Sequence, residues 1–157
     1  MIRCLTAALL TLSLATVAAQ AQDRQEGYYY PEITSVEEYT RNLPAPEATR
    51  EDRLSFIASL MRAQGQLPYP NRMAIFAKGA AAEKLIIVAL DDGIFRTLHR
   101  ARGQMAIMTT VIRQLPFFAE RGLQFNVTFY DMIQMLDFDH LTLSDGITWA
   151  HRVDFPD

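Results

Sequence analysis

Two of the three histidines flank an Asp-Gly pair near the C-terminus. Asp145-Gly146 is a strong signal for a two-residue β-turn, and a hairpin centred on it places His140 directly across from His151. Their Cβ atoms would then lie roughly 5 Å apart on one sheet face, where two imidazoles can share zinc or copper. Asp137 or Glu120 is the candidate oxygen ligand. No H-x-x-x-H or H-E-x-x-H spacing supports this site, so half-exposed histidines bonded to neighbours or water are the alternative.

A second candidate site is a group of basic side chains that follows the other Asp-Gly pair, Asp92-Gly93. We expect a hairpin there as well, with Ile94–His99 as its second strand and a helix from Gly103 onwards. The free N–H groups at a helix start favour anions, so basic side chains near it could form an oxyanion or phosphate pocket. A solvated rim is the alternative. The four candidate ligand-binding residues are Arg96, His99, Arg100 and Arg102.

Signatures of covalent catalysis and of nucleotide binding are absent from the sequence. The only cysteine is Cys4, and there is no G-x-S-x-G nucleophile motif, because the Ser-Asp-Gly at 144–146 is typical of a turn. The sequence also lacks a phosphate-binding loop and a dinucleotide-binding fingerprint. It therefore predicts no catalytic residue.

The first 21 residues have the features of a cleavable signal peptide. Arg3 precedes the apolar run Leu5–Ala19, and the small-residue pattern Ala19-Gln20-Ala21 predicts cleavage after Ala21. An uncleaved membrane anchor is the alternative, but this run is shorter than the roughly 20 apolar residues that cross a bilayer. We therefore expect a periplasmic or secreted protein.

Removing these 21 of the 157 residues leaves 136, with 14 Lys and Arg against 18 Asp and Glu and a net charge near minus four. That length suits one domain whose core needs no disulfides. Because basic residues form no stripe, nucleic acid and anionic lipid surfaces are poor partners. No second long apolar run occurs, so we expect no transmembrane segment in the mature chain.

Residues 22–47 are predicted to form an extended aromatic arm with one short helix. The residue pair Ser35 and Glu38 matches a capping box, which predicts a helix from about Val36 to Arg41 that stops before the prolines at 44 and 46. The arm could bind a protein partner in the periplasm or in a membrane complex. Its candidate partner-binding residues are Tyr28, Tyr29 and Tyr30.

Residues 48–157 are predicted to be a single α+β domain, an antiparallel sheet of about five strands with two Asp-Gly hairpins and about three packed helices. The residue pairs Thr49 with Asp52 and Thr128 with Asp131 predict two helix starts, and Arg53 is expected to face water. The predicted helices run from Thr49 to Gly65, from Gly103 to Leu115 and from Phe129 to Leu136. The predicted strands are Met73–Ala77, Lys84–Leu90, Ile94–His99, His140–Ser144 and Ile147–Val153.

Five segments carry a resemblance that covers most of the mature chain. They are Tyr28-Tyr-Tyr-Pro-Glu-Ile-Thr34, Ile75-Phe-Ala-Lys-Gly79, Glu83-Lys-Leu-Ile-Ile-Val-Ala-Leu-Asp-Asp-Gly-Ile-Phe-Arg-Thr-Leu98, Arg100-Ala-Arg-Gly-Gln-Met105 and Ser144-Asp-Gly-Ile-Thr-Trp-Ala-His151. With them the chain resembles a small family of exported bacterial proteins that are often labelled molybdopterin-guanine dinucleotide biosynthesis protein A. That label implies guanylyl transfer from GTP. Transferases of that name carry the loop L-x-G-G-x-S-x-R-M-G-x-D-K, which this sequence lacks.

These observations favour an exported accessory or binding protein without catalytic activity of its own. The alternative is a small metal-binding protein or hydrolase built on His140 and His151. Nucleotide transfer comes third, because the nucleotide loop is missing and an exported chain does not readily meet cytosolic GTP.

Overall fold

The computed structural model describes residues 30–41, 48–120, 122–123 and 125–156. In these ranges the chain forms five strands and four helices, of which one is a single turn. The strands are β1 (Ser35–Glu38), β2 (Met73–Lys78), β3 (Lys84–Ala89), β4 (His140–Ser144) and β5 (Ala150–Asp154). The helices are α2 (Arg50–Gly65), α3 (Leu98–Ile112), α4 (Pro116–Ala119) and α5 (Phe129–Met135).

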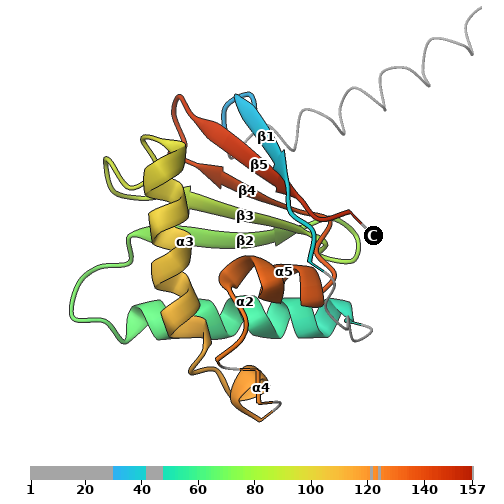
Figure 1. Cartoon of the computed structure of the whole chain (residues 1–157). Helices are drawn as coiled ribbons and strands as arrows, with labels where there is room; N and C mark the ends of the chain where they lie inside the picture. The colour runs from blue at the N-terminus through green and yellow to red at the C-terminus, as the bar shows by residue number, and fades with distance from the viewer. Residues whose placement is uncertain (1–29, 42–47, 121, 124, 157) are drawn as a thin grey trace, which may run out of the picture.

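The strands form one sheet in the order β1-β5-β4-β3-β2. The pairs β2 with β3 and β4 with β5 are antiparallel, while β1 with β5 and β3 with β4 are parallel. Figure 1 shows α3 crossing in front of the sheet, with α2 and α5 near its β2 end. The α+β class and the number of strands are confirmed, although the predicted strand Ile94–His99 is not among the five, and the sheet is mixed. In the described part of the chain, no helix has the length and apolar character that a bilayer crossing requires.

Two of the helices begin where local capping signals predict. The Thr49 side chain accepts a hydrogen bond from the backbone of Asp52, whose carboxylate accepts one in return from the backbone of Thr49, and α2 begins at the next residue. Thr128 and Asp131 form the same reciprocal pair at the start of α5. Each pair satisfies N–H groups that a helix leaves unpaired at its first turn. The predictions for these two starts are confirmed.

The core lies between the sheet and the helices. Because alternate residues of a strand share a face, the register places Leu85, Leu141 and Val153 in one row across β3, β4 and β5, and all three are fully buried. From the helices, large apolar side chains complete the cluster. They include Phe56 and Leu60 of α2, Met105 and Met108 of α3, and Met132 and Ile133 of α5.

The predicted hairpin at Asp92-Gly93 and its second strand are wrong. Residue Thr97 caps α3 by accepting a hydrogen bond from the backbone of Arg100, so the helix begins at Leu98 rather than near Gly103. The partner of β3 on this side is instead β2, which is connected to it through residues 79–83. Gly79 takes a φ of +90° in that connection, which glycine adopts without a steric cost.

The predicted helix at Val36–Arg41 is also wrong, because this part of the arm is the edge strand β1. β1 pairs in parallel with β5, and the ladder is extended by hydrogen bonds from the backbone of Thr34 to Ala150 (2.8 Å) and of Tyr39 to Asp154 (2.9 Å). Of the three predicted partner-binding tyrosines, those at 28 and 29 lie outside the described residues, and Tyr30 is half-buried.

Arg53 does not face water as the helical pattern predicted, since it is 5% exposed. Its guanidinium donates to the carbonyl oxygens of Ala81 (3.0 Å), Leu136 (3.0 Å) and Asp137 (2.9 Å). Two of these carbonyls follow α5, at a point where the chain leaves the helix and Asp137 takes a φ of 57°. One arginine of α2 therefore holds the end of α5 and the connection between β2 and β3.

Candidate functional site

The hairpin of β4 and β5 has a register that separates the two histidines. Residue His140 pairs with Asp154, and His151 pairs with Leu143. The predicted register differs from this one by three residues, and because an odd shift moves a side chain to the other face, the two imidazoles lie on opposite faces of the sheet. The predicted pairing of His140 with His151 is therefore wrong.

The side chain of Asp145 explains the shift. Its carboxylate accepts hydrogen bonds from the backbone N–H groups of Ile147 (2.9 Å), Thr148 (2.8 Å) and Trp149 (2.8 Å). Burial alone would raise the pKa of Asp145, but these donors and the Thr148 hydroxyl lower it overall. The carboxylate thus organises a five-residue turn over 145–149 in place of the tight turn that Asp-Gly signals.

The candidate oxygen ligand Asp137 gives the predicted metal site no support either. Its carboxylate is largely exposed and lies 3.5 Å from Arg53, to which it is ion-paired. Across the ranges that the structure describes, no three His, Cys, Asp or Glu side chains come close enough together to hold a metal ion.

Residue His140 is half-buried between charged neighbours, and this predicts a pH dependence of stability. Burial lowers its pKa below the ordinary value of 6.5, and the positive charges of Arg152 and Lys84 act in the same direction. Below about pH 6.5, His140 is protonated in the unfolded chain but stays neutral in the folded protein, whose His140 pKa is lower. The unfolded chain therefore binds more protons, and the free energy of unfolding decreases as the pH falls. We expect the free energy of unfolding, measured in urea at pH 7.5 and 5.5, to decrease less in His140→Gln than in the unsubstituted protein. Equal decreases would contradict this assignment.

The four predicted ligand-binding residues do not all meet at one point, although the side chains of Arg96 and Arg100 both lie beside Gly93. Arg96 and His99 are exposed. Arg100 donates back to the carbonyl of Gly93 (2.9 Å), whereas Arg102 forms an ion pair with Glu37 of β1. Positions two apart on a helix point about 200° apart around its axis, which explains why Arg100 and Arg102 leave α3 in different directions.

Arg102 and His151, predicted for two different sites, meet at one carboxylate that sequence reasoning missed. Glu37 pairs with Arg102 through Oε2, and its Oε1 lies 3.4 Å from Nε2 of His151. The other ring nitrogen of His151, Nδ1, is 2.8 Å from the Ser35 hydroxyl oxygen. Ser35 and Glu37 share a strand face at i and i+2, and β1 pairing with β5 brings both to the imidazole.

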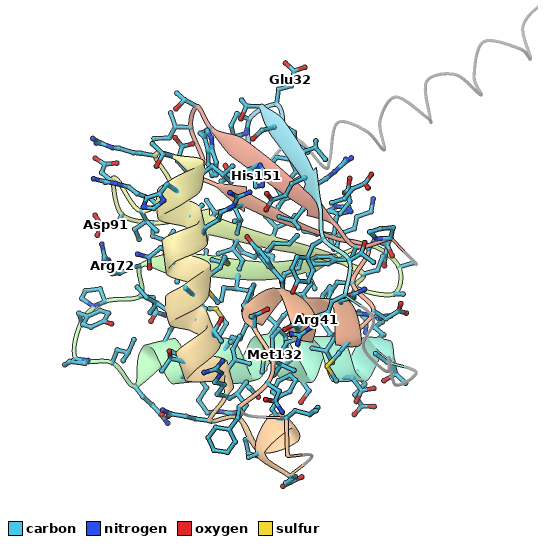
Figure 2. All side chains as sticks on the ribbon, viewed as in Figure 1. Glu32, Arg41, Arg72, Asp91, Met132 and His151 are labelled. Carbon is cyan, nitrogen blue, oxygen red and sulfur yellow. The ribbon has the colours of Figure 1, made fainter. Side chains whose placement is uncertain are left out.

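A hydroxyl, an imidazole and a carboxylate in this order are the groups that nucleophilic hydrolases use. Here His151 is only 1% exposed, and the Trp149 ring stacks on it at 6.0 Å with an interplanar angle of 18°. Figure 2 shows His151 inside the layer between the sheet and the top of α3. The imidazole is buried, and the three side chains join β1 to β5.

An apolar pocket lies between α2, α3 and the connection that follows α2, and we call it the α2–α3 groove. Its volume is about 200 Å³. The lining is mostly apolar and comprises Leu60, Gln64, Leu67, Tyr69, Pro70, Asn71, Arg72, Met73, Gln104, Ile107, Met108 and Val111. Ile107 is 59% exposed. Leu67 and Tyr69 lie between Gly65 and Pro70, in a segment that cannot continue the helix, and both are exposed. Large apolar residues in such a connection are the sequence signal that could have indicated this groove.

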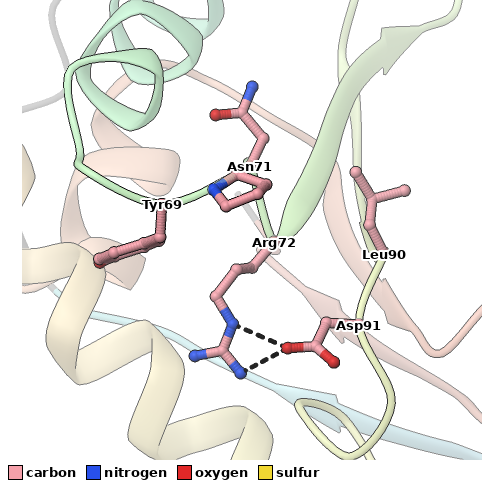
Figure 3. Close-up of a pocket in the computed structure, with 6 residues that line it drawn as sticks. Tyr69, Asn71, Arg72, Leu90 and Asp91 are labelled. Carbon is pink, nitrogen blue, oxygen red and sulfur yellow. Dashed lines mark hydrogen bonds and ion pairs between the residues drawn. The ribbon is translucent and has the colours of Figure 1, made fainter.

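The connection 66–72 also borders a more open hollow on its other side. Figure 3 shows Tyr69, Asn71, Arg72, Leu90 and Asp91 around it. Arg72 and Asp91 form an exposed ion pair at 2.9 Å, and Figure 2 shows the two side by side at the edge of the molecule. An exposed pair of this kind contributes little to stability, so it is free to exchange partners with a polar ligand group.

The polar atom that distinguishes the α2–α3 groove is the amide nitrogen of Gln64. Among the described residues this Nε2 atom is buried and has no hydrogen-bond partner. A buried donor without a partner costs about 1–3 kcal/mol, so its presence beside an apolar pocket requires an explanation. Pattern reasoning missed Gln64 because a single glutamine in a helix carries no signal.

Comparisons with protein-family models, with curated proteins and with solved structures give no match to this chain.

Proposed function

We propose that this chain is an exported accessory or binding protein without catalytic activity of its own, and that its ligand occupies the α2–α3 groove. The observation that carries the proposal is the unpartnered Gln64 amide in the lining of an apolar pocket. Small-molecule sites are mostly apolar and contain a few polar groups that fix the orientation of the ligand. The groove has this composition.

The lining limits the chemistry of the ligand. Leu60, Met108 and Val111 favour an apolar group, and a pocket of about 200 Å³ is below the usual size for a whole drug-sized molecule. Gln64 Nε2 is a hydrogen-bond donor, so its partner in a ligand must be an acceptor, and among apolar lining residues a carbonyl fits this role. The ligand is therefore an apolar group with an acceptor at one end, such as an acyl chain or an aromatic ketone.

Replacing Gln64 by methionine should stabilise the free protein and weaken ligand binding. The substitution removes the buried donor and keeps a side chain of similar length, so we expect the free energy of unfolding to rise by about 1 kcal/mol. Urea unfolding followed by circular dichroism measures this change. A loss of stability would show that the amide has a structural partner and would remove the observation on which the proposal depends.

Binding can be measured with prodan, an uncharged naphthalene ketone whose fluorescence reports an apolar environment. We expect prodan to bind the unsubstituted protein and to bind severalfold more weakly to Gln64→Met and to Ile107→Gln. Ile147→Gln is the matched control, because Ile147 is 74% exposed in the turn between β4 and β5 and does not line the groove. Equal affinities for Ile107→Gln and Ile147→Gln would contradict the proposed site.

A further inference from the structure

The helix α3 separates the α2–α3 groove from a second pocket, which we call the α3–α5 pocket. Arg102, Ala106 and Thr109 of α3 and the residue that caps its end, Arg113, line it. Their intervals of three and four residues place them on one helical face. The opposite wall is aromatic and includes Tyr130. Its volume is about 410 Å³, within the range of small-molecule sites.

The charge of the α3–α5 pocket differs from that of the chain. The whole sequence has a net charge of −3, yet two arginines and no Asp or Glu occur among the described residues that line this pocket. Arg113 uses Nε in a long hydrogen bond of 3.4 Å to the carbonyl of Val127, and Arg102 uses Nη2 for Glu37. A guanidinium has five N–H donors, so both arginines retain donors for a ligand.

The aromatic wall adds apolar surface and one polar atom without a partner. Tyr39 and Tyr130 lie with their ring centroids 5.2 Å apart. Within the described ranges, the Tyr130 hydroxyl is buried and has no hydrogen-bond partner. Burial, together with the charge of Glu37, raises the pKa of Tyr130 to about 12. The hydroxyl therefore stays neutral near pH 7 and adds no negative charge to the pocket.

From this geometry we propose that the α3–α5 pocket binds a small organic anion with an apolar body and an oxyanion group at each end. Arg102 and Arg113 are 11 residues apart in the chain, which separates their backbones by about 16 Å along a helix axis. Each arginine therefore meets a different end of the ligand, while the tyrosine rings contact its middle. Guanidinium groups bind carboxylates and phosphates alike, so the shared chemistry is an oxyanion group at each end of an apolar body.

Isothermal titration calorimetry of the full chain tests this proposal with sebacate as the dicarboxylate and hexane-1,6-diyl bisphosphate as the diphosphate. We expect at least one of them to bind, to bind more weakly at high salt, and to bind at least about tenfold more weakly to Arg113→Gln. Arg113→Lys, which keeps the charge, should recover part of the affinity. Decane-1,10-diol, which has no charge, should not bind.

The controls separate this pocket from the groove and from a folding defect. Arg62→Gln should keep the affinity of the unsubstituted protein, since Arg62 is exposed on α2. Gln64→Met should also bind the two-ended anion normally, so a failure of one proposal is distinguishable from a failure of the other. Circular dichroism would verify that Arg113→Gln is folded. The proposal is overturned if neither sebacate nor the bisphosphate binds, or if Arg113→Gln binds them as tightly as the unsubstituted protein does.

Discussion

Replacing Arg53 by methionine is expected to lower the free energy of unfolding by about 2–4 kcal/mol. The substitution keeps most of the apolar stem but removes three hydrogen bonds, to the carbonyls of Ala81, Leu136 and Asp137. Hydrogen bonds from a charged donor contribute more than neutral ones, and the carbonyl of the buried Leu136 would be left without its donor. For a domain of this size the melting temperature should fall by about 10 °C.

Urea unfolding and thermal melts measure this effect, and the same helix provides the control. Arg62→Met removes an exposed arginine from α2 and should change the free energy of unfolding by less than about 0.5 kcal/mol. Arg53→Lys should fall between the two, because an ammonium keeps the charge but cannot reproduce the planar fork of donors. If Arg53→Met were as stable as Arg62→Met, the role assigned to Arg53 in joining α2 to α5 would be wrong.

The second large effect is expected at Asp131, which is fully buried at the start of α5. Its carboxylate accepts hydrogen bonds from the Tyr39 hydroxyl (2.6 Å) and the backbone of Thr128 (2.7 Å), and it forms an ion pair with Arg41 (2.5 Å). Asp131→Asn removes the charge and replaces one acceptor oxygen by a donor. We expect the free energy of unfolding to fall by about 2–3 kcal/mol. The remaining hydrogen bonds lose the charged acceptor that strengthens them, and at one buried contact the new amide N–H group would face another donor.

Two partner variants divide this loss into its parts. Tyr39→Phe removes one hydrogen bond and should lower the free energy of unfolding by about 1 kcal/mol. Arg41→Gln should cost less than Asp131→Asn, since the Arg41 side chain is half-exposed and its ion pair is screened. Denaturant unfolding gives all three values. A larger loss in Arg41→Gln than in Asp131→Asn would show that the ion pair, and not the buried carboxylate, stabilises this end of α5.

Asp131 and Arg53 also show which contacts can be predicted from the sequence and which cannot. Asp131 was predicted as a capping residue because its partner, Thr128, is three positions away. The contacts of Asp131 with Tyr39 and Arg41 join residues about ninety positions apart, and no local pattern contains them. Arg53 was assigned to solvent because an isolated amphipathic helix places its charges outward. The carbonyls that bury Arg53 come from residues 28 to 84 positions away.

The candidate site was less predictable than the fold. Arg102 and His151 were both singled out from the sequence, but each was assigned to a different site. They meet because β1 pairs with β5 and brings Glu37 between them. The α2–α3 groove and the α3–α5 pocket depend on which helix packs on which, and periodicity within one helix does not contain that information.

The sequence by itself determined the α+β class, strands β2, β3 and β4, and the starts of α2 and α5, because capping and alternation act over a few residues. Tertiary structure decided most of the rest. Pairing with β5 made residues 35–38 a strand despite their capping pattern, because a distant hydrogen-bonded partner outweighed a local preference of about 1 kcal/mol. The turn that separates His140 from His151 is local by contrast, since the Asp145 carboxylate binds backbone N–H groups two to four residues further along the chain. There one local signal, the carboxylate, prevailed over another, the Asp-Gly tight turn.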